Sequence, residues 1–295
     1  MKYFNPKYST VLLFIFIPIL LYLFVIFVPL GRAFHYSLHS GTRFQLDYFI
    51  GLGNYIRLFS DPVFWISLGN NAIIVGSGII VQLPLAFVLA CILYFGRVRF
   101  SSYFRAVFFF PVIISPVVVS LLWLIMYHFQ FGLLNNLLIL MGLEDSRRNW
   151  LGEPNIAIFA ITAPLVYQYL GLVLVILLSG MTGISKDVLE MAEIDGASGF
   201  RRAIFIILPL LKNTINVCLV LNISGGVRIF EQVLIMTRGG PGTSTMVMAY
   251  YSYLHSFTHG NIGYGSTIAI MMLIISLVVI FIMFMFRRGF KTDDI

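Results

Sequence analysis

Long apolar runs separated by short polar segments set the hydrophobic pattern of this chain. A run of about 20 apolar residues is long enough for a helix to cross the hydrocarbon core of a bilayer. Apart from Lys212, the runs contain no Asp, Glu, Arg or Lys. The alternation of a membrane β-barrel strand is missing from them. The pattern predicts an all-α polytopic membrane protein, one transmembrane domain over 1–295, with about six spans at 11–30, 72–95, 106–127, 156–182, 203–224 and 266–286.

Composition supports the membrane assignment. Hydrophobic residues make up 59% of the chain and charged residues 11%, whereas about 25% of a soluble domain is charged. The first run could instead be a cleaved signal peptide, because Lys2 and Lys7 precede it. It is longer than the roughly 7–15 residues of a signal core, and no A-x-A-like site follows. A membrane-spanning first helix is therefore favoured.

Lys and Arg in the connecting segments predict the orientation. The short segments 1–10, 96–105, 183–202 and 287–295 carry 11 of the 19 basic residues, and the three longer alternate segments carry 7. Both termini and the segment 183–202 are therefore expected on the cytoplasmic side. The net charge of +7 is explained by these flanks and by anionic lipid headgroups, so no nucleic-acid partner is expected.

Candidate chemistry is sparse. "RGGPGTST" (238–245) lacks the Gly-Lys-Ser/Thr of a phosphate-binding loop and is expected to form a tight turn. The pairs His35/His39 and His255/His259 have helical spacing that could ligate a metal, but no glutamate lies between them, and interfacial histidines are the favoured interpretation. Cys91 and Cys218 both lie in apolar runs and provide neither a disulfide framework nor a cysteine-based zinc site. We expect no catalytic residue, no metal site and no cofactor bound by this chain.

One polar segment interrupts the apolar pattern in an organised way. In "EMAEIDGASGFRRAIFIILP" (190–209), acidic residues precede Gly196 and paired arginines follow it. Ser185 can cap a helix that contains Glu190 and Ala192, and Gly196 permits a sharp break. A second helix is expected to start within 199–208. The resulting helix–turn–helix would present a compact surface to a soluble partner.

The spacing in this segment resembles the cytoplasmic loop signature of permease subunits of ABC importers. That signature reads E-x-A, three residues, Gly, nine residues, Ile, one residue and Leu-Pro. It falls here on Glu190, Ala192, Gly196, Ile206, Leu208 and Pro209. Met191 is a departure, because the family usually has Ala there. The resemblance implies that 183–209 is a coupling loop that docks into an ATPase subunit.

Other stretches are similar to the oligosaccharide, maltose-permease-like branch of that family. They are "GLGNYIRLFSDPVFW" (51–65), "FRAVFFFPVIISPVVVSLLW" (104–123), "FGLLNNLLILMGL" (131–143) and "TRGGPGTSTMVMAYYSYLHSF" (237–257) followed by "GYGSTIAI". The resemblance implies the type I ABC importer permease fold in a bacterial or archaeal plasma (inner) membrane. The implied partners are a second permease subunit, an ATPase dimer that holds ATP and magnesium, an extracellular solute-binding protein and a carbohydrate.

Polar and aromatic residues inside the spans are candidates for a substrate path, because they are costly in a membrane. Sugars need hydrogen-bonding partners for their hydroxyls and aromatic rings for their C–H faces. Helix–helix hydrogen bonding and an interfacial aromatic belt are the alternatives. The resemblance places the family's sugar-contacting positions on Asn222, Gly226 and Ile229, and on Gln168, Tyr169 and Leu172. The expected path comprises Asn222, Gln168, Tyr169, Tyr167, Ser120, Trp123 and Gly226.

Two further functions remain open from the sequence. The chain could be an ABC permease for a non-sugar solute, and nearby Arg228 and Glu231 could favour a charged sugar or simply pair with each other. A membrane enzyme acting on lipid-linked sugars is less favoured, because the spans lack a carboxylate cluster.

Overall fold

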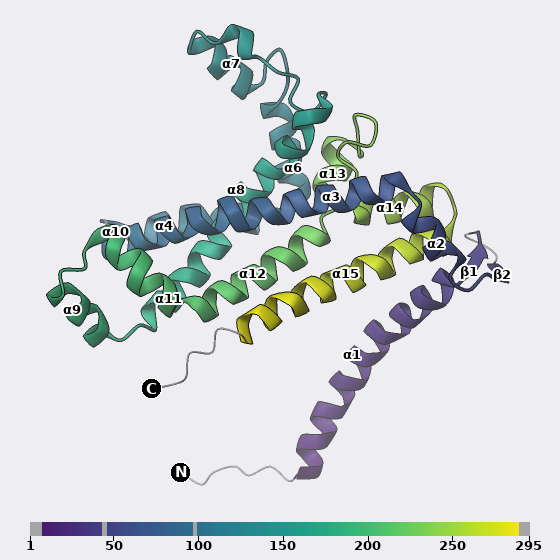
Figure 1. Ribbon diagram of the computed structural model, residues 1–295, viewed down its shortest axis with the longest axis horizontal. Coiled ribbons are helices and arrows are strands. Elements are labelled where there is room, and N and C mark those ends of the chain that lie inside the picture. Colours follow the sequence, from purple (N-terminus) through teal and green to yellow (C-terminus); the bar gives the residue numbers. More distant parts are fainter. Residues whose placement is uncertain (1–7, 43–45, 97–98, 289–295) are drawn as a thin grey trace. The chain divides into compact units, whose positions relative to one another are not determined.

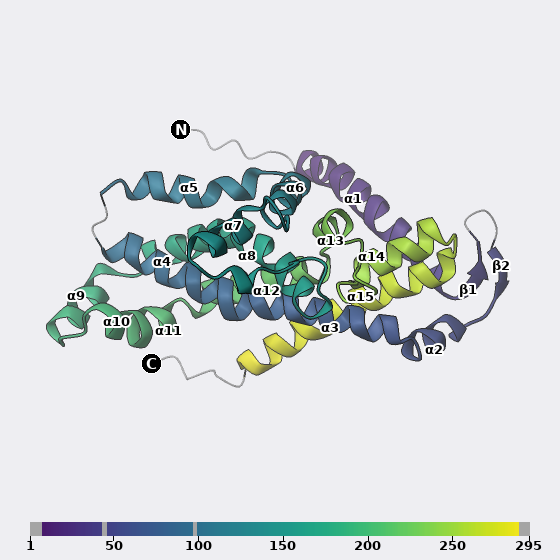
Figure 2. The ribbon, with the colours of Figure 1, turned by 90° about the horizontal axis from the view of Figure 1, so that it is seen from above.

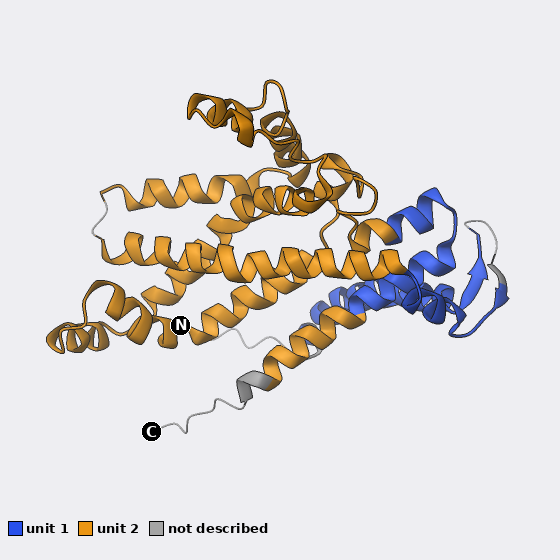
Figure 3. Ribbon diagram, turned by 45° about the horizontal axis from the view of Figure 1, so that its top comes forward, with its two compact units in different colours: residues 1–61, 252–273 blue, residues 62–251, 274–295 orange. Residues whose placement is uncertain are grey.

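The computed structural model describes residues 8–42, 46–96 and 99–288. It is almost entirely helical (Figure 1). The chain forms two compact units, 1–61 with 252–273, and 62–251 with 274–295 (Figure 3). The single domain expected over 1–295 stays a prediction. The elements are α1 (Tyr8–Ser37), β1 (His39–Gly41), β2 (Leu46–Phe49), α2 (Gly53–Phe59), α3 (Pro62–Ser77), η1 (Gly78–Gln82), α4 (Leu83–Phe95), α5 (Ser101–Ile113), α6 (Pro116–Met126), α7 (Leu133–Leu140), η2 (Glu144–Ser146), α8 (Pro154–Thr182), α9 (Lys186–Ile194), α10 (Gly199–Arg202), η3 (Ala203–Ile207), α11 (Leu208–Leu210), α12 (Lys212–Val227), α13 (Glu231–Met236), α14 (Met248–Tyr253), η4 (Leu254–Thr258) and α15 (Ile262–Arg288).

The smaller unit joins α1 to an antiparallel pair of short strands and to α2. Nδ2 of Asn54 donates to the backbone carbonyls of Ser37 (3.0 Å) and His39 (3.1 Å). The Ser37 hydroxyl lies 2.8 Å from the Tyr55 hydroxyl. The Ser37 carbonyl is at the C-terminal end of α1, where it has no helical partner of its own, and His39 begins β1. These bonds fix α2 to the end of α1.

The same unit contains a cluster of polar side chains around Tyr264. The Tyr264 hydroxyl donates to a carboxylate oxygen of Asp61 at 2.5 Å. The Arg57 guanidinium lies 4.4 Å from the centre of the Tyr264 ring, and the ring of His255 packs edge-on against it at 4.7 Å. The rings of His255 and His259 lie 5.2 Å apart. Burial, then the positive charges of His259 and Arg57, lower the pKa of His255 to about 4, while Asp61 acts in the opposite sense.

This pKa shift predicts that the smaller unit loses stability in acid. His255 lies outside the membrane-spanning helices. The unfolded chain takes up a proton on His255 below about pH 6.5, but the folded chain resists it until about pH 4. The unfolded state binds more protons in this window, so the free energy of unfolding falls as pH falls. Hydrogen exchange of the 254–258 amides should accelerate between pH 6.5 and 4 beyond the intrinsic exchange rate. His255→Gln should remove part of that dependence; an identical profile in the variant would contradict the assignment.

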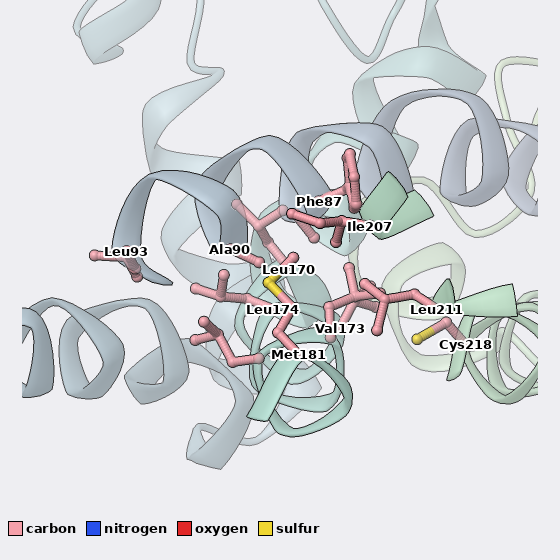
Figure 4. Close-up of a cluster of buried hydrophobic side chains, with 13 residues drawn as sticks. Phe87, Ala90, Leu93, Leu170, Val173, Leu174, Met181, Ile207, Leu211 and Cys218 are labelled. Carbon is pink, nitrogen blue, oxygen red and sulfur yellow. The ribbon is translucent and has the colours of Figure 1, made fainter. Parts of the chain in front are cut away.

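The larger unit is built around α8. This helix packs against α3, α4, α5, α6 and α12. In its most apolar stretch 56% of the residues are buried, whereas none are buried in the most apolar stretch of α1. Leu174 and Leu177 of α8 are fully buried in a core with side chains from α4 and with Ile207 and Leu211 (Figure 4). Gly171 of α8 lies where a Cβ would overlap the carbonyl oxygen of Phe108 in α5. The absence of a side chain there lets the two backbones approach closely.

The spans differ from the predicted ones in three places, the first being the second span, which begins at Pro62 rather than at 72. Five helices of the described residues are long and apolar enough to cross a membrane. The span expected over 106–127 is broken into α5 and α6, which meet at a 97° bend; counted as one span, this pair is a sixth. Ile114 and Ser115 have extended backbones (ψ 138° and 136°), as expected for residues that lead into a proline, here Pro116. The fifth span begins at Lys212 rather than at 203, because Leu211 separates α12 from η3 and α11.

Candidate functional site

The predicted coupling loop folds as a helix, a turn and a second helical segment. Ser185 caps α9, and its hydroxyl accepts from the amide of Asp187 at 3.2 Å. The helix ends at Gly196, whose φ is +75°, a conformation that costs a side chain-bearing residue about 1–2 kcal/mol. The chain then continues through α10, η3 and α11. The structure confirms the predicted cap and the predicted break at Gly196.

The coupling loop presents charged and apolar side chains together. Glu190 is exposed, and so are Ile194 (85%) and Phe200 (78%). Ala192 is 5% exposed, so it packs within the chain. The exposed surface comes from the neighbouring side chains instead.

The coupling loop is attached to the core of the larger unit. Ile207 is fully buried, and Leu208 packs partly against the same core, while Pro209 is exposed. The Arg202 guanidinium lies 4.3 Å from the centre of the Phe95 ring, at the end of α4. Both ribbon views show α9 to α11 beside that end of α4 (Figure 2). These contacts connect the loop to α4 and to the core that contains α8.

A cavity of about 290 Å³ lies among α3, η1, α8, α12 and α13. Its volume is near the lower end of the range of ligand pockets, roughly 300–1,000 Å³. Three of the predicted path residues line it, namely Tyr169, Asn222 and Gly226. Its further polar lining comes from Gln82, Thr162, Arg228, Glu231 and Gln232.

Asn222 is held across the cavity by Gln82. Nδ2 of Asn222 donates to Oε1 of Gln82 at 3.2 Å, which leaves Nε2 of Gln82 as a donor on a side chain that lines the cavity. A Cβ on Gly78 would overlap Oδ1 of Asn222. The glycine thus makes room for the asparagine. The expected substrate path did not include Gln82, although a glutamine inside an apolar run is itself a signal.

Gln168 lies behind the cavity wall and not on it. It is 1% exposed, and its Nε2 donates to the carbonyl of Ile114 at 2.9 Å. Its Oε1 accepts from Nε2 of Gln232 at 3.4 Å. Gln232, which the sequence analysis did not single out, is the residue of this chain of bonds that lines the cavity.

Gly226 has a packing role besides lining the cavity. Nδ2 of Asn71 donates to the carbonyls of Gly226 (2.8 Å) and Val227 (3.2 Å), and a Cβ on Gly226 would come within 2.6 Å of Cγ2 of Val75. Arg228 bonds through Nε to the carbonyl of Ser224 at 3.0 Å. Among the ion pairs of the described part of the chain, Arg228 and Glu231 do not form one.

Three predicted path residues lie away from this cavity. The Ser120 hydroxyl donates to the carbonyl of Pro116 in its own helix at 2.7 Å. The Trp123 ring lies 5.3 Å from that of Tyr127 and 6.1 Å from that of Tyr167, and Tyr167 is 51% exposed. Trp123 and Tyr167 belong to an aromatic group on α6 and α8, whereas Ser120 bonds within its own helix. Their place on a substrate path stays a prediction.

Comparison with known proteins places this geometry in context. Residues 82–292 match the family described as "Binding-protein-dependent transport system inner membrane component". The chain is 34% identical to a probable ABC transporter permease protein of Bacillus subtilis over 88% of this chain and 90% of that protein. It is 31% identical to the trehalose/maltose transport system permease protein of Thermococcus litoralis over 87% of each. A chain of a bacterial ABC transporter that imports the acidic polysaccharide alginate superposes with a TM-score of 0.82 at 20% identity, covering 97% of this chain and 98% of that chain.

Proposed function

Because the chain belongs to the binding-protein-dependent transport system inner membrane components, we propose that it is the pore-forming permease subunit of an ATP-driven importer for an oligosaccharide. The cavity carries the proposal: Tyr169 offers an aromatic face, and Asn222, Gln82 and Gln232 offer amide groups. Sugars bind through this combination of ring stacking and hydroxyl hydrogen bonds. The name of the Thermococcus relative, a trehalose/maltose permease, supports a carbohydrate substrate.

In such an importer, each functional surface of the chain faces a different partner. The coupling loop, with exposed Glu190, Ile194 and Phe200, docks into a cytoplasmic ATPase subunit that holds ATP and magnesium. A carboxylate at its surface offers a charge-assisted hydrogen bond to a basic residue. A second permease subunit completes the pore, and a solute-binding protein delivers the sugar on the opposite side. Both termini then lie in the cytoplasm.

Uptake measurements test the transport function itself. The chain, reconstituted in vesicles with the permease, ATPase and solute-binding protein encoded beside it, should accumulate a radiolabelled oligosaccharide only when ATP is supplied. Accumulation of a non-sugar solute instead would favour the alternative ABC permease. Chemical turnover of a lipid-linked sugar without accumulation would contradict the permease function and favour the membrane enzyme.

Asn222 is expected to be required for uptake. Asn222→Leu removes an amide from the cavity and leaves Oε1 of Gln82 without its donor. An unpartnered buried polar group costs about 1–3 kcal/mol, and each 1.4 kcal/mol corresponds to a tenfold change. Uptake by reconstituted vesicles should fall by about tenfold or more, while the variant still copurifies with its partners.

Asn216→Leu provides the matched control. Asn216 lies in the same helix, six residues earlier, and does not line the cavity. Uptake by this variant should stay near that of the wild type. Equal losses from both substitutions would show that the defect comes from the helix and not from the cavity.

A further inference from the structure

A buried glutamine at the cavity carries an acceptor atom without a partner. Gln232 is 0% exposed and lines the cavity. Its Oε1 has no hydrogen-bond partner among the described residues. Leaving such an atom unpaired costs about 1–3 kcal/mol. A donor that reaches this side chain from the cavity would satisfy the atom.

The orientation of the Gln232 amide is fixed by a chain of bonds that starts at a backbone carbonyl. The carbonyl of Ile114 can only accept, so the amide group that faces it must be Nε2 of Gln168. Oε1 of Gln168 then faces Gln232, and only Nε2 of Gln232 can donate to it. Rotating either amide by 180° would bring two donors or two acceptors together. The remaining atom of Gln232 is consequently Oε1, an acceptor.

The Ile114 carbonyl is available for this role because of the bend between α5 and α6. Ile114 directly follows the last residue of α5 and has an extended backbone (ψ 138°). The two helices break there by 97°, so this carbonyl faces a partner outside a regular helix. The bend thus determines the first hydrogen bond in the series that runs from the Ile114 carbonyl through Gln168 to Gln232. Gln168, buried behind the wall, acts on the cavity only through Gln232.

We propose that Oε1 of Gln232 accepts a hydrogen bond from one hydroxyl group of the transported sugar, and that Gln168 and the Ile114 carbonyl position it for this bond. The inference rests on the proposed carbohydrate transport and adds a specificity contact to it. A ligand group that can only accept hydrogen bonds would be repelled by Oε1 of Gln232 at this point. The site therefore selects for a donor.

Fluorinated sugars test the direction of this bond, because fluorine replaces a hydroxyl with a group that cannot donate. Uptake of radiolabelled trehalose, maltose and other disaccharides by the wild-type complex first identifies a carried sugar. Its monodeoxyfluoro series is then compared with the parent sugar. We expect one position of the series to lower wild-type uptake by about tenfold, the equivalent of about 1.4 kcal/mol.

Gln232→Met removes the acceptor at similar side-chain length and should erase the penalty at that one position while leaving the others unchanged. Thr182→Val is the matched control: Thr182 belongs to α8 but does not line the cavity, and its hydroxyl donates to the carbonyl of Ser179 at 2.7 Å. This variant should keep the wild-type pattern. If Gln232→Met does not assemble, the double variant Gln168→Met with Gln232→Met carries the same test, because removing both partners of a buried bond is tolerated better than removing one.

The outcomes separate the two proposals. Carbohydrate uptake with the same position-specific penalty in wild type and Gln232→Met would overturn the Gln232 contact alone. So would a wild-type series without any penalised position. A wild-type complex that carries no carbohydrate would overturn the proposed function and this contact with it.

Discussion

Gly196→Asp is expected to reduce uptake to less than about a tenth of the wild-type level while the chain still inserts into the membrane. Gly196 has φ +75°, and nothing lies within 4 Å of the position that a Cβ would take. The substitution therefore costs the isolated chain only backbone strain, about 1–2 kcal/mol. At the docking surface, it adds a negative charge and shifts Ile194 and Phe200 relative to each other. A tenfold loss requires only 1.4 kcal/mol of lost coupling.

Gly142→Asp isolates the effect of position from the effect of the substitution. Gly142 has φ +74° and equally open surroundings, but it lies between α7 and η2, far from the coupling loop in sequence. Uptake and stimulated ATPase activity should persist in this variant and collapse in Gly196→Asp. Normal uptake with normal ATPase stimulation in Gly196→Asp would refute the docking role. Crosslinks that place Glu190 away from the ATPase would refute it independently.

Gly171→Ala is expected to destabilise the larger unit, although alanine normally strengthens a helix. The added methyl group would overlap the carbonyl oxygen of Phe108, and a backbone atom cannot rotate away as a side chain can. Overpacking of this kind costs typically 1–3 kcal/mol, and α5 would have to separate from α8. The unfolding midpoint of the purified chain in detergent should fall clearly.

The control Gly69→Ala should shift stability in the opposite direction. Gly69 lies within α3, and nothing lies within 4 Å of the position of its Cβ. Replacing a helical glycine in open surroundings gains up to about 1 kcal/mol. A fall of equal size in both variants would mean that glycine flexibility, and not the contact between α5 and α8, determines the result.

Local signals predicted the coupling loop well. Ser185 caps its helix and Gly196 ends it, as expected, because a cap and a left-handed turn depend on residues only a few positions apart. The apolar runs predicted α8 and α15 for the same kind of reason, since a long apolar run has few alternatives in a membrane. The bend before Pro116 was also a local signal, but the surrounding apolar run concealed it.

The cavity was only partly predictable, because it depends on contacts between distant segments. Tyr169 and Asn222 were predicted and line it. Gln168 was predicted from its polarity and from the resemblance, yet its side chain bonds to Gln232 and Ile114, residues 64 and 54 positions away. Gln232 lies beyond the end of the predicted span 203–224. No periodicity within one span can place these amides in a row.

The five-residue π-helix η1 (Gly78–Gln82) determines which side of α4 faces the core. A π turn accommodates one more residue than an α turn, and successive residues of an α-helix are rotated by about 100° around its axis. If all five residues of η1 adopted an ordinary α-helix instead, α4 would be rotated by that angle relative to α3. Ala86 and Ala90, now fully buried, would turn away from α8 while Asn71 kept its place. The π turn therefore keeps α4 in phase with α3, and a one-residue deletion within η1, which leaves an ordinary α-helix in that same phase, should be less harmful than a one-residue deletion elsewhere in α3 or α4.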